Sequence, residues 1–170
     1  MHKLRDAPGD SEADLKRQIE DLAGGRKVYV LGLGNTDRAD DGAGVLVALA
    51  VKKLFPSYSY SEHDGIEGIV LDISEKEENA AVFFVDAANL GAAPGTVSIV
   101  TRDRIKETEI TTHRVAVALM ASVLEKAGIT SAVVCIQPLR IDFQAAMSKP
   151  VADAVEKVAG ILSDIMRSKP

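Results

Sequence analysis

The chain has 170 residues, a formal net charge of -5 at pH 7 and 46% hydrophobic residues, values that fit one globular domain. Only 4% of the residues are aromatic and no basic stripe is visible, which argues against a nucleic-acid-binding protein. The N-terminal residues lack the apolar core of a signal peptide, and no apolar run reaches the roughly 18 residues of a membrane span. We therefore expect a cytoplasmic protein without membrane insertion.

Residues 1–26 differ in composition from the rest of the chain. They begin with a charged stretch, which predicts a mobile tail. Ser11 is a good N-cap for a short polar helix that continues to Leu22, and Gly24 is a typical end signal. We interpret 1–26 as a tail with a short helix, and 27–170 as a single α/β domain.

From residue 27 onward, apolar runs alternate with segments of helical length. Strands are predicted at 27–33, 58–63, 80–85, 96–101 and 132–137, and helices at 42–55, 67–76, 113–127 and 151–166. The connection between Asp86 and Gly95 is too short for a helical crossover, so strand 96–101 should run antiparallel to strand 80–85. The pattern predicts a three-layer α/β/α sandwich around a mixed, mostly parallel five-stranded sheet.

A glycine-rich turn follows the first strand. Gly32 and Gly34 suggest a dinucleotide-binding loop, but Asp37 occupies the position of the third glycine in that fingerprint. Asp40 and Asp41 fall at the start of the following helix, where a pyrophosphate would bind the free N–H groups. Two carboxylates would repel it, which argues against a nucleotide site.

The paired carboxylates of Asp40 and Asp41 leave two interpretations open. One is helix capping, since aspartate is favoured at the N-cap and in the first turn. The other is a cation site or a general base, because one cap does not explain two adjacent acids. Both roles are compatible if Asp40 caps the helix and Asp41 points outward.

Asp86 and His113 are candidate partners of Asp41. Asp86 ends the third strand, and ligands bind at the carboxyl ends of strands in open α/β sheets. His113 begins a predicted helix, whose N-terminus disfavours the imidazolium and keeps the ring neutral. Two aspartates and a neutral histidine suit a divalent ion such as Ni²⁺ or Zn²⁺. The alternative for Asp86 is a loop-capping acid, and the alternative for His113 is a polar helix cap.

Four motifs in chain order resemble those of the [NiFe]-hydrogenase maturation endopeptidases. They are GLGN and DDGAG at 32–35 and 40–44, VDA and PG at 85–87 and 94–95, TTH at 111–113, and IQP with IDF at 136–138 and 141–143. The TTH and QP elements are most similar to the branch that processes the hydrogenase of formate hydrogenlyase. The segments at 36–39 and 65–68 depart from the family pattern, which affects the choice of precursor.

The resemblance implies a fold with a twisted five-stranded sheet and a specific proteolytic reaction. Family members remove a C-terminal extension from the precursor of the hydrogenase large subunit after nickel insertion. The nickel arrives with the precursor and serves as the recognition signal, with no organic cofactor. The resemblance assigns the catalytic and nickel-contacting roles to Asp41, Asp86 and His113. It implies an aspartic-type peptidase whose partner is the precursor, and we expect a monomer.

Two alternatives remain at this point. A chaperone that senses the loaded nickel site without cutting would need the same residues. A nucleotide-dependent α/β oxidoreductase would need the third glycine that Asp37 replaces and an acid after the second strand, which Asp64 supplies only loosely.

Overall fold

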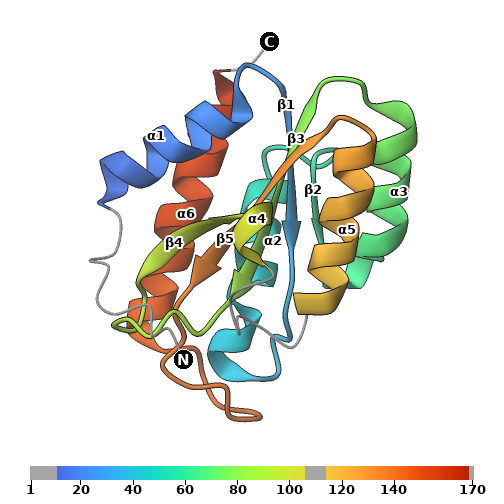
Figure 1. Cartoon of the computed structure of the whole chain (residues 1–170). Helices are drawn as coiled ribbons and strands as arrows, with labels where there is room; N and C mark the ends of the chain where they lie inside the picture. Colours follow the sequence, from blue (N-terminus) through green and yellow to red (C-terminus); the bar gives the residue numbers. More distant parts are fainter. Residues whose placement is uncertain (1–10, 106–113, 169–170) are drawn as a thin grey trace.

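A mixed five-stranded sheet forms the centre of the molecule (Figure 1). The computed structural model describes residues 11–105 and 114–168. The strands are β1 (Lys27–Gly32), β2 (Ser59–Ser61), β3 (Ala80–Ala87), β4 (Val97–Thr101) and β5 (Thr130–Ile136). Their order is β2-β1-β3-β5-β4, and every neighbouring pair is parallel except β4 with β5.

Helices cover both faces of this sheet. They are α1 (Glu12–Ala23), η1 (Ala39–Gly42), α2 (Ala43–Lys52), η2 (Glu62–Asp64), α3 (Ile66–Lys76), α4 (Arg102–Ile105), α5 (Arg114–Lys126) and α6 (Lys149–Arg167). The buried side chains of α1, α2 and α6 form one core with one sheet face, and those of α3 and α5 form a second core with the other. The predicted α/β/α sandwich is confirmed.

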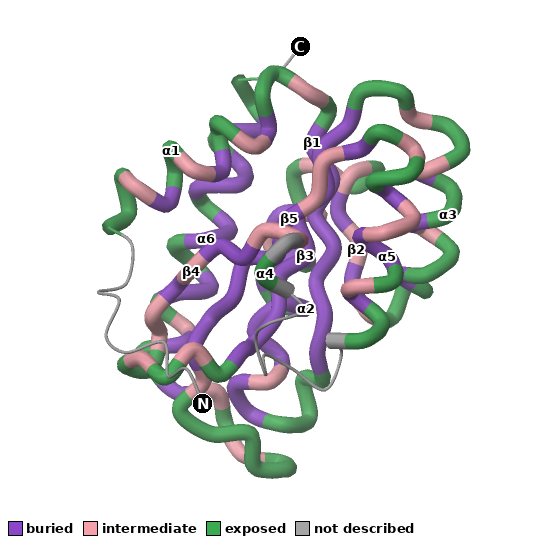
Figure 2. The backbone as a smooth tube through the Cα atoms, viewed as in Figure 1, coloured by how far each residue is buried: buried purple, intermediate pink, exposed green. Residues whose placement is uncertain are grey.

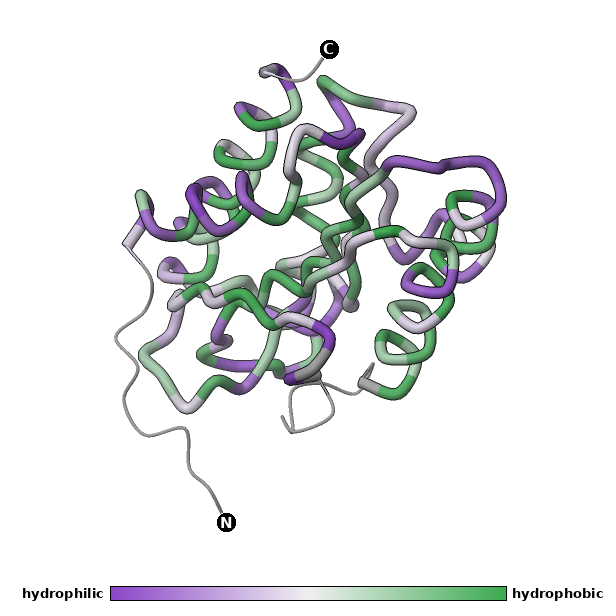
Figure 3. The backbone as a smooth tube through the Cα atoms, turned by 45° about the horizontal axis from the view of Figure 1, so that its top comes forward, coloured by the Kyte–Doolittle hydropathy of each residue, from purple (hydrophilic) through white to green (hydrophobic). Residues whose placement is uncertain are grey.

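The central strands are apolar because both of their faces are covered. All eight residues of β3 are buried, with Phe83 in the core under α6 and Phe84 in the core under α3 and α5. A parallel strand covered on both sides reads as a continuous apolar run, without polar alternation. Figure 2 shows this burial along the central strands, and Figure 3 shows the matching hydropathy.

Two predicted elements are markedly shorter in the structure. The second strand is limited to β2, because residues 62–64 turn into η2, which a capping box between Ser61 and Asp64 holds. The helix expected at 42–55 begins as η1 and continues as the shorter α2. The reversed direction of the fourth strand is confirmed, and its hydrogen-bonded neighbour is β5.

The N-terminal helix α1 packs onto the same core as the rest of the chain. Ser11 Oγ accepts a hydrogen bond from the N–H of Asp14 at 3.1 Å, and Gly24 ends the helix in the left-handed region, as expected. Leu15 and Ile19 are fully buried within the core that includes α6. The boundary at 26/27 stays a prediction. Within the described ranges, no helix is both long and apolar enough to cross a membrane.

Candidate active site

The candidate site lies at the carboxyl edge of the sheet, the lower edge in Figure 1. Since β1, β3 and β5 are parallel, the segments that follow them leave the sheet at the same edge. These segments are 33–42, 88–96 and 137–148. Crevices outside the carboxyl ends of parallel strands are the usual ligand sites of this architecture.

Close backbone contacts fasten the turn after β1 to the end of β3. The N–H of Leu33 donates to the carbonyl oxygen of Val85 at 2.8 Å. A Cβ atom on Gly44 would overlap the carbonyl oxygens of Leu33 and Val85, and one on Gly32 would overlap the carbonyl of Gly44. Glycine is required here because α2 begins directly against the two strand ends. The turn that contains Asp41 is thereby fixed beside the strand that contains Asp86.

Asp41 is partly buried and belongs to this turn. Its Oδ2 accepts a hydrogen bond from the backbone N–H of Asn35 at 3.0 Å. Gly34 has a φ of +120°, and a Cβ there would overlap the carbonyl oxygen of Asp41. The carboxylate is therefore held by the turn, and its other oxygen has no hydrogen bond within the described part of the chain.

Asp40 is fully buried and has a different role from the predicted helix cap. Its carboxylate accepts the backbone N–H groups of Leu139 (2.8 Å), Arg140 (3.1 Å) and Ser148 (2.6 Å). The hydroxyl of Ser148 also donates to it, at 2.9 Å. No side chain caps α2, so the capping prediction for Asp40 is wrong. Asp40, in η1, instead joins the turn before α2 to the segment after β5.

The hydrogen bonds around Asp40 keep it ionised. Burial by itself raises the pKa of a carboxyl group, since the charged form loses its hydration. The three N–H donors and the Ser148 hydroxyl outweigh that effect, so the pKa of Asp40 lies below its ordinary value of 3.8. A negative charge is therefore fixed at this edge of the sheet.

Asp86 is also buried, one residue before the end of β3. It lies between Phe84 and Ala88 on the alternation that faces α3 and α5, and it pairs in register with Cys135 on β5. Burial, and secondarily the charge of Asp86, raises the pKa of the Cys135 thiol. Cys135 is the buried apolar residue that its sequence context predicts, and it stays a neutral thiol.

His113, the third predicted site residue, lies outside the described residues. The helix that follows it, α5, begins at Arg114 at the same lower edge (Figure 1). Within 11–105 and 114–168, no three His, Cys, Asp or Glu side chains are grouped as a metal site. The structure thus brings Asp41 and Asp86 to one edge, and the role of His113 stays a prediction.

Gln137 is a structural residue whose role the sequence did not reveal. Its side chain is buried, and Oε1 accepts the N–H groups of Leu90 (2.6 Å) and Ala92 (3.4 Å). Its backbone carbonyl accepts the N–H of Gly95 at 2.8 Å. Gln137 therefore shapes the segment that follows Asp86. The IQP motif includes Gln137, but a sequence motif does not show which groups hydrogen-bond to its side chain.

Comparisons with known proteins agree with this arrangement. The family model HycI, hydrogenase maturation protease, matches residues 65–165. The Hydrogenase 3 maturation protease of Escherichia coli K12 is 31% identical over 132 residues, which cover 76% of this chain and 84% of that protein. The chain belongs to the hydrogenase maturation protease family. The resemblance stated from the four motifs is confirmed.

Solved structures of the family share the fold. The [NiFe] hydrogenase maturation protease HycI from Thermococcus kodakarensis KOD1 is similar with a TM-score of 0.74 and 26% identity, over 89% of this chain and 99% of that one. The endopeptidase HycI from Escherichia coli is similar with a TM-score of 0.66 and 26% identity, over 81% of this chain and 90% of that one. These homologues support a protease function for this chain.

Proposed function

We propose that this protein is an endopeptidase that removes the C-terminal extension of a [NiFe]-hydrogenase large-subunit precursor after nickel insertion. Asp41, Asp86 and His113 contact the nickel, which the precursor brings as part of the substrate. No organic cofactor takes part. Family membership supports proteolysis as the reaction, and the positions of Asp41 and Asp86 support the carboxyl edge of the sheet as its site.

The observation that carries the proposal is that two acidic residues, Asp41 and Asp86, lie at the same edge of the sheet. Asp41 follows β1 and Asp86 ends β3, and the Leu33–Val85 hydrogen bond joins the two neighbouring backbones at 2.8 Å. Carboxylate oxygens and an imidazole nitrogen are suitable additional ligands for a divalent ion that already has thiolate ligands.

The nickel, held by cysteine thiolates of the precursor, docks between these side chains and so places the scissile peptide beside them. Two routes to hydrolysis are compatible with the residues. In the first, the nickel polarises the scissile carbonyl and lowers the pKa of a bound water. In the second, one aspartate is the general base, an effect of about 10²–10⁴-fold on the rate.

The first test is the intact mass of a nickel-loaded precursor before and after incubation with the enzyme. We expect Asp41→Asn and His113→Ala to lower the cleavage rate at least about 100-fold while the proteins remain folded. Asp72→Asn, an exposed change on α3, is the matched control and should cleave normally. Full processing by either site variant would refute the assignment.

The same experiment tests the nickel requirement. A precursor without nickel should keep its full mass, because the docking ligand is missing. Binding of the nickel-loaded precursor without loss of mass would instead identify a metallocentre-sensing chaperone. Cleavage of the metal-free precursor at an equal rate would contradict nickel recognition.

A further inference from the structure

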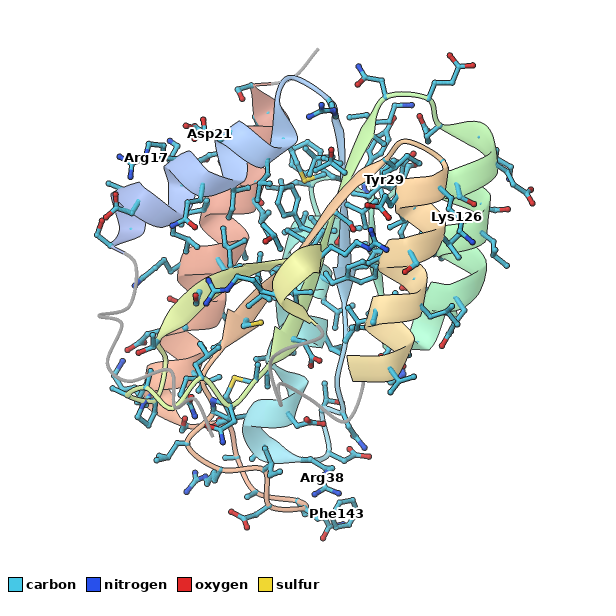
Figure 4. All side chains as sticks on the ribbon, in the orientation of Figure 1. Arg17, Asp21, Tyr29, Arg38, Lys126 and Phe143 are labelled. Atoms are coloured by element: carbon cyan, nitrogen blue, oxygen red, sulfur yellow. The ribbon has the colours of Figure 1, made fainter. Side chains whose placement is uncertain are left out.

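The segment after β5 exposes three large apolar side chains in close succession. Leu139, Ile141 and Phe143 are 57%, 48% and 66% exposed. We call these three residues the apolar loop. They alternate with Arg140 and Asp142, and Figure 4 shows Phe143 at the lower end of the molecule. A cluster of exposed apolar side chains is typical of an interaction surface, whereas single ones are ordinary.

The apolar loop is held in a defined position despite its exposure. Asp40 binds the N–H groups of Leu139 and Arg140, and the N–H of Gln144 donates to the carbonyl oxygen of Asp37 at 2.7 Å. The Arg140 guanidinium also donates to the carbonyl of Ala146 at 3.0 Å. The backbone is therefore anchored to the turn after β1 at two points, and burial of the side chains requires little further ordering.

The anchors also place the apolar loop beside the candidate site. Asp37 and Asp40 supply the attachment points, and Asp41 directly follows Asp40 in the chain. In Figure 4, Arg38, from the same turn, and Phe143 both lie at the lower end of the molecule. The apolar loop is thus adjacent to the turn that contains Asp41.

We propose that the apolar loop is a docking surface for the folded body of the large-subunit precursor, next to the nickel that Asp41 contacts. This inference rests on the proposed function. The apolar side chains form the centre of the contact, and Arg38 and Asp142 form its polar rim, the usual arrangement in protein–protein interfaces. The expected partner surface is an apolar patch near the precursor's C-terminal extension. Continuity with the catalytic edge favours the precursor over a second copy of this chain.

The test measures KM and kcat for cleavage of the nickel-loaded precursor by Phe143→Ser and by Leu139→Ser/Phe143→Ser. We expect KM to rise about tenfold for the single variant and further for the double variant. The kcat should change less than about twofold, because these residues lie outside the reacting centre. Leu54→Ser, two residues past the C-terminal end of α2 and 52% exposed, is the matched control. Circular dichroism and melting temperature check the fold of all variants.

A separate binding measurement distinguishes failure of the inference from failure of the proposed function. Immobilised nickel-loaded precursor should bind the double variant at least about tenfold more weakly than the wild type. If the wild type binds without cutting and the variant loses binding, the docking surface stands and the endopeptidase function fails. If the wild type cuts and the variants keep its KM, the docking surface is wrong. Wild-type dimers that the variants abolish, with KM unchanged, would also overturn it in favour of self-association.

Discussion

Acidic side chains at the two edges of the sheet are held by different kinds of interaction. At the amino edge, Glu77 accepts a hydrogen bond from Tyr29 and forms an ion pair with Lys27 at 2.8 Å, near solvent. At the carboxyl edge, Asp40 is fully buried and is held by backbone N–H groups and a hydroxyl. An exposed ion pair contributes little to stability, whereas a buried carboxylate is costly without several donors. The comparison shows that, of these two acids, the fold supplies backbone hydrogen-bond donors to the one at the carboxyl edge, whose charge is buried.

The largest expected effect in this comparison is the loss of stability in Asp40→Asn. The amide group of asparagine would face N–H donors, and at least one of the buried N–H groups of Leu139, Arg140 and Ser148 would lose its acceptor. We expect the free energy of unfolding to fall by about 3 kcal/mol, as measured by urea denaturation. Ser148→Ala removes only the hydroxyl donor and should cost about 1 kcal/mol. Equal stability of Asp40→Asn and wild type would show that the anchor is dispensable.

The acid sensitivity of the fold gives a second, smaller effect. The pKa of Asp40 is lowered in the folded state, so its stabilising contribution is present above the ordinary aspartate value of 3.8 and disappears as the pH falls through the lower folded value. The stability difference between wild type and Asp40→Asn should therefore narrow as the pH falls below the ordinary aspartate value of 3.8. Urea melts at several pH values provide the measurement, and a constant difference would contradict the ionised state.

The smallest effect is expected at the amino edge. Glu77→Gln removes the ion pair with Lys27 and leaves an acceptor for Tyr29, so the unfolding free energy should change by less than about 1 kcal/mol. Cleavage of the precursor should be unaffected, because Glu77 lies at the opposite edge from Asp41. If Glu77→Gln lowered the free energy of unfolding as much as Asp40→Asn, the two edges would not differ in how strongly their acidic side chains stabilise the fold.

Much of the fold was predictable from the sequence because the central strands are buried on both faces. The strands predicted at 80–85 and 132–137 overlap β3 and β5 within two residues, since an apolar run and its polar flanks mark the limits. The strand predicted at 58–63 is observed only at 59–61, because residues 62–64 form η2, which the capping box between Ser61 and Asp64 holds.

The site was predictable only where sheet topology decides it. Parallel strands bring Asp41 and Asp86 to one edge, and that follows from the order of strands and helices. The partners of Asp40 were not predictable: Leu139 is 99 residues away along the chain, and the donors are backbone N–H groups, which leave no mark in a sequence. The roles of Asp41, Asp86 and His113 stay predictions until the variants are measured.

The hydrogen bonds from Leu139 and Arg140 to Asp40 do not depend on the side chains of these two residues. It binds the backbone N–H groups of Leu139 and Arg140, which nearly every residue type possesses. Side chains along the apolar loop are therefore free to vary while the path of the loop and the position of Asp41 are kept. The proposed docking surface and the proposed cleavage site therefore depend on different parts of this edge, so loops from other family members are candidates for exchange onto it without redesign of the turn beneath them.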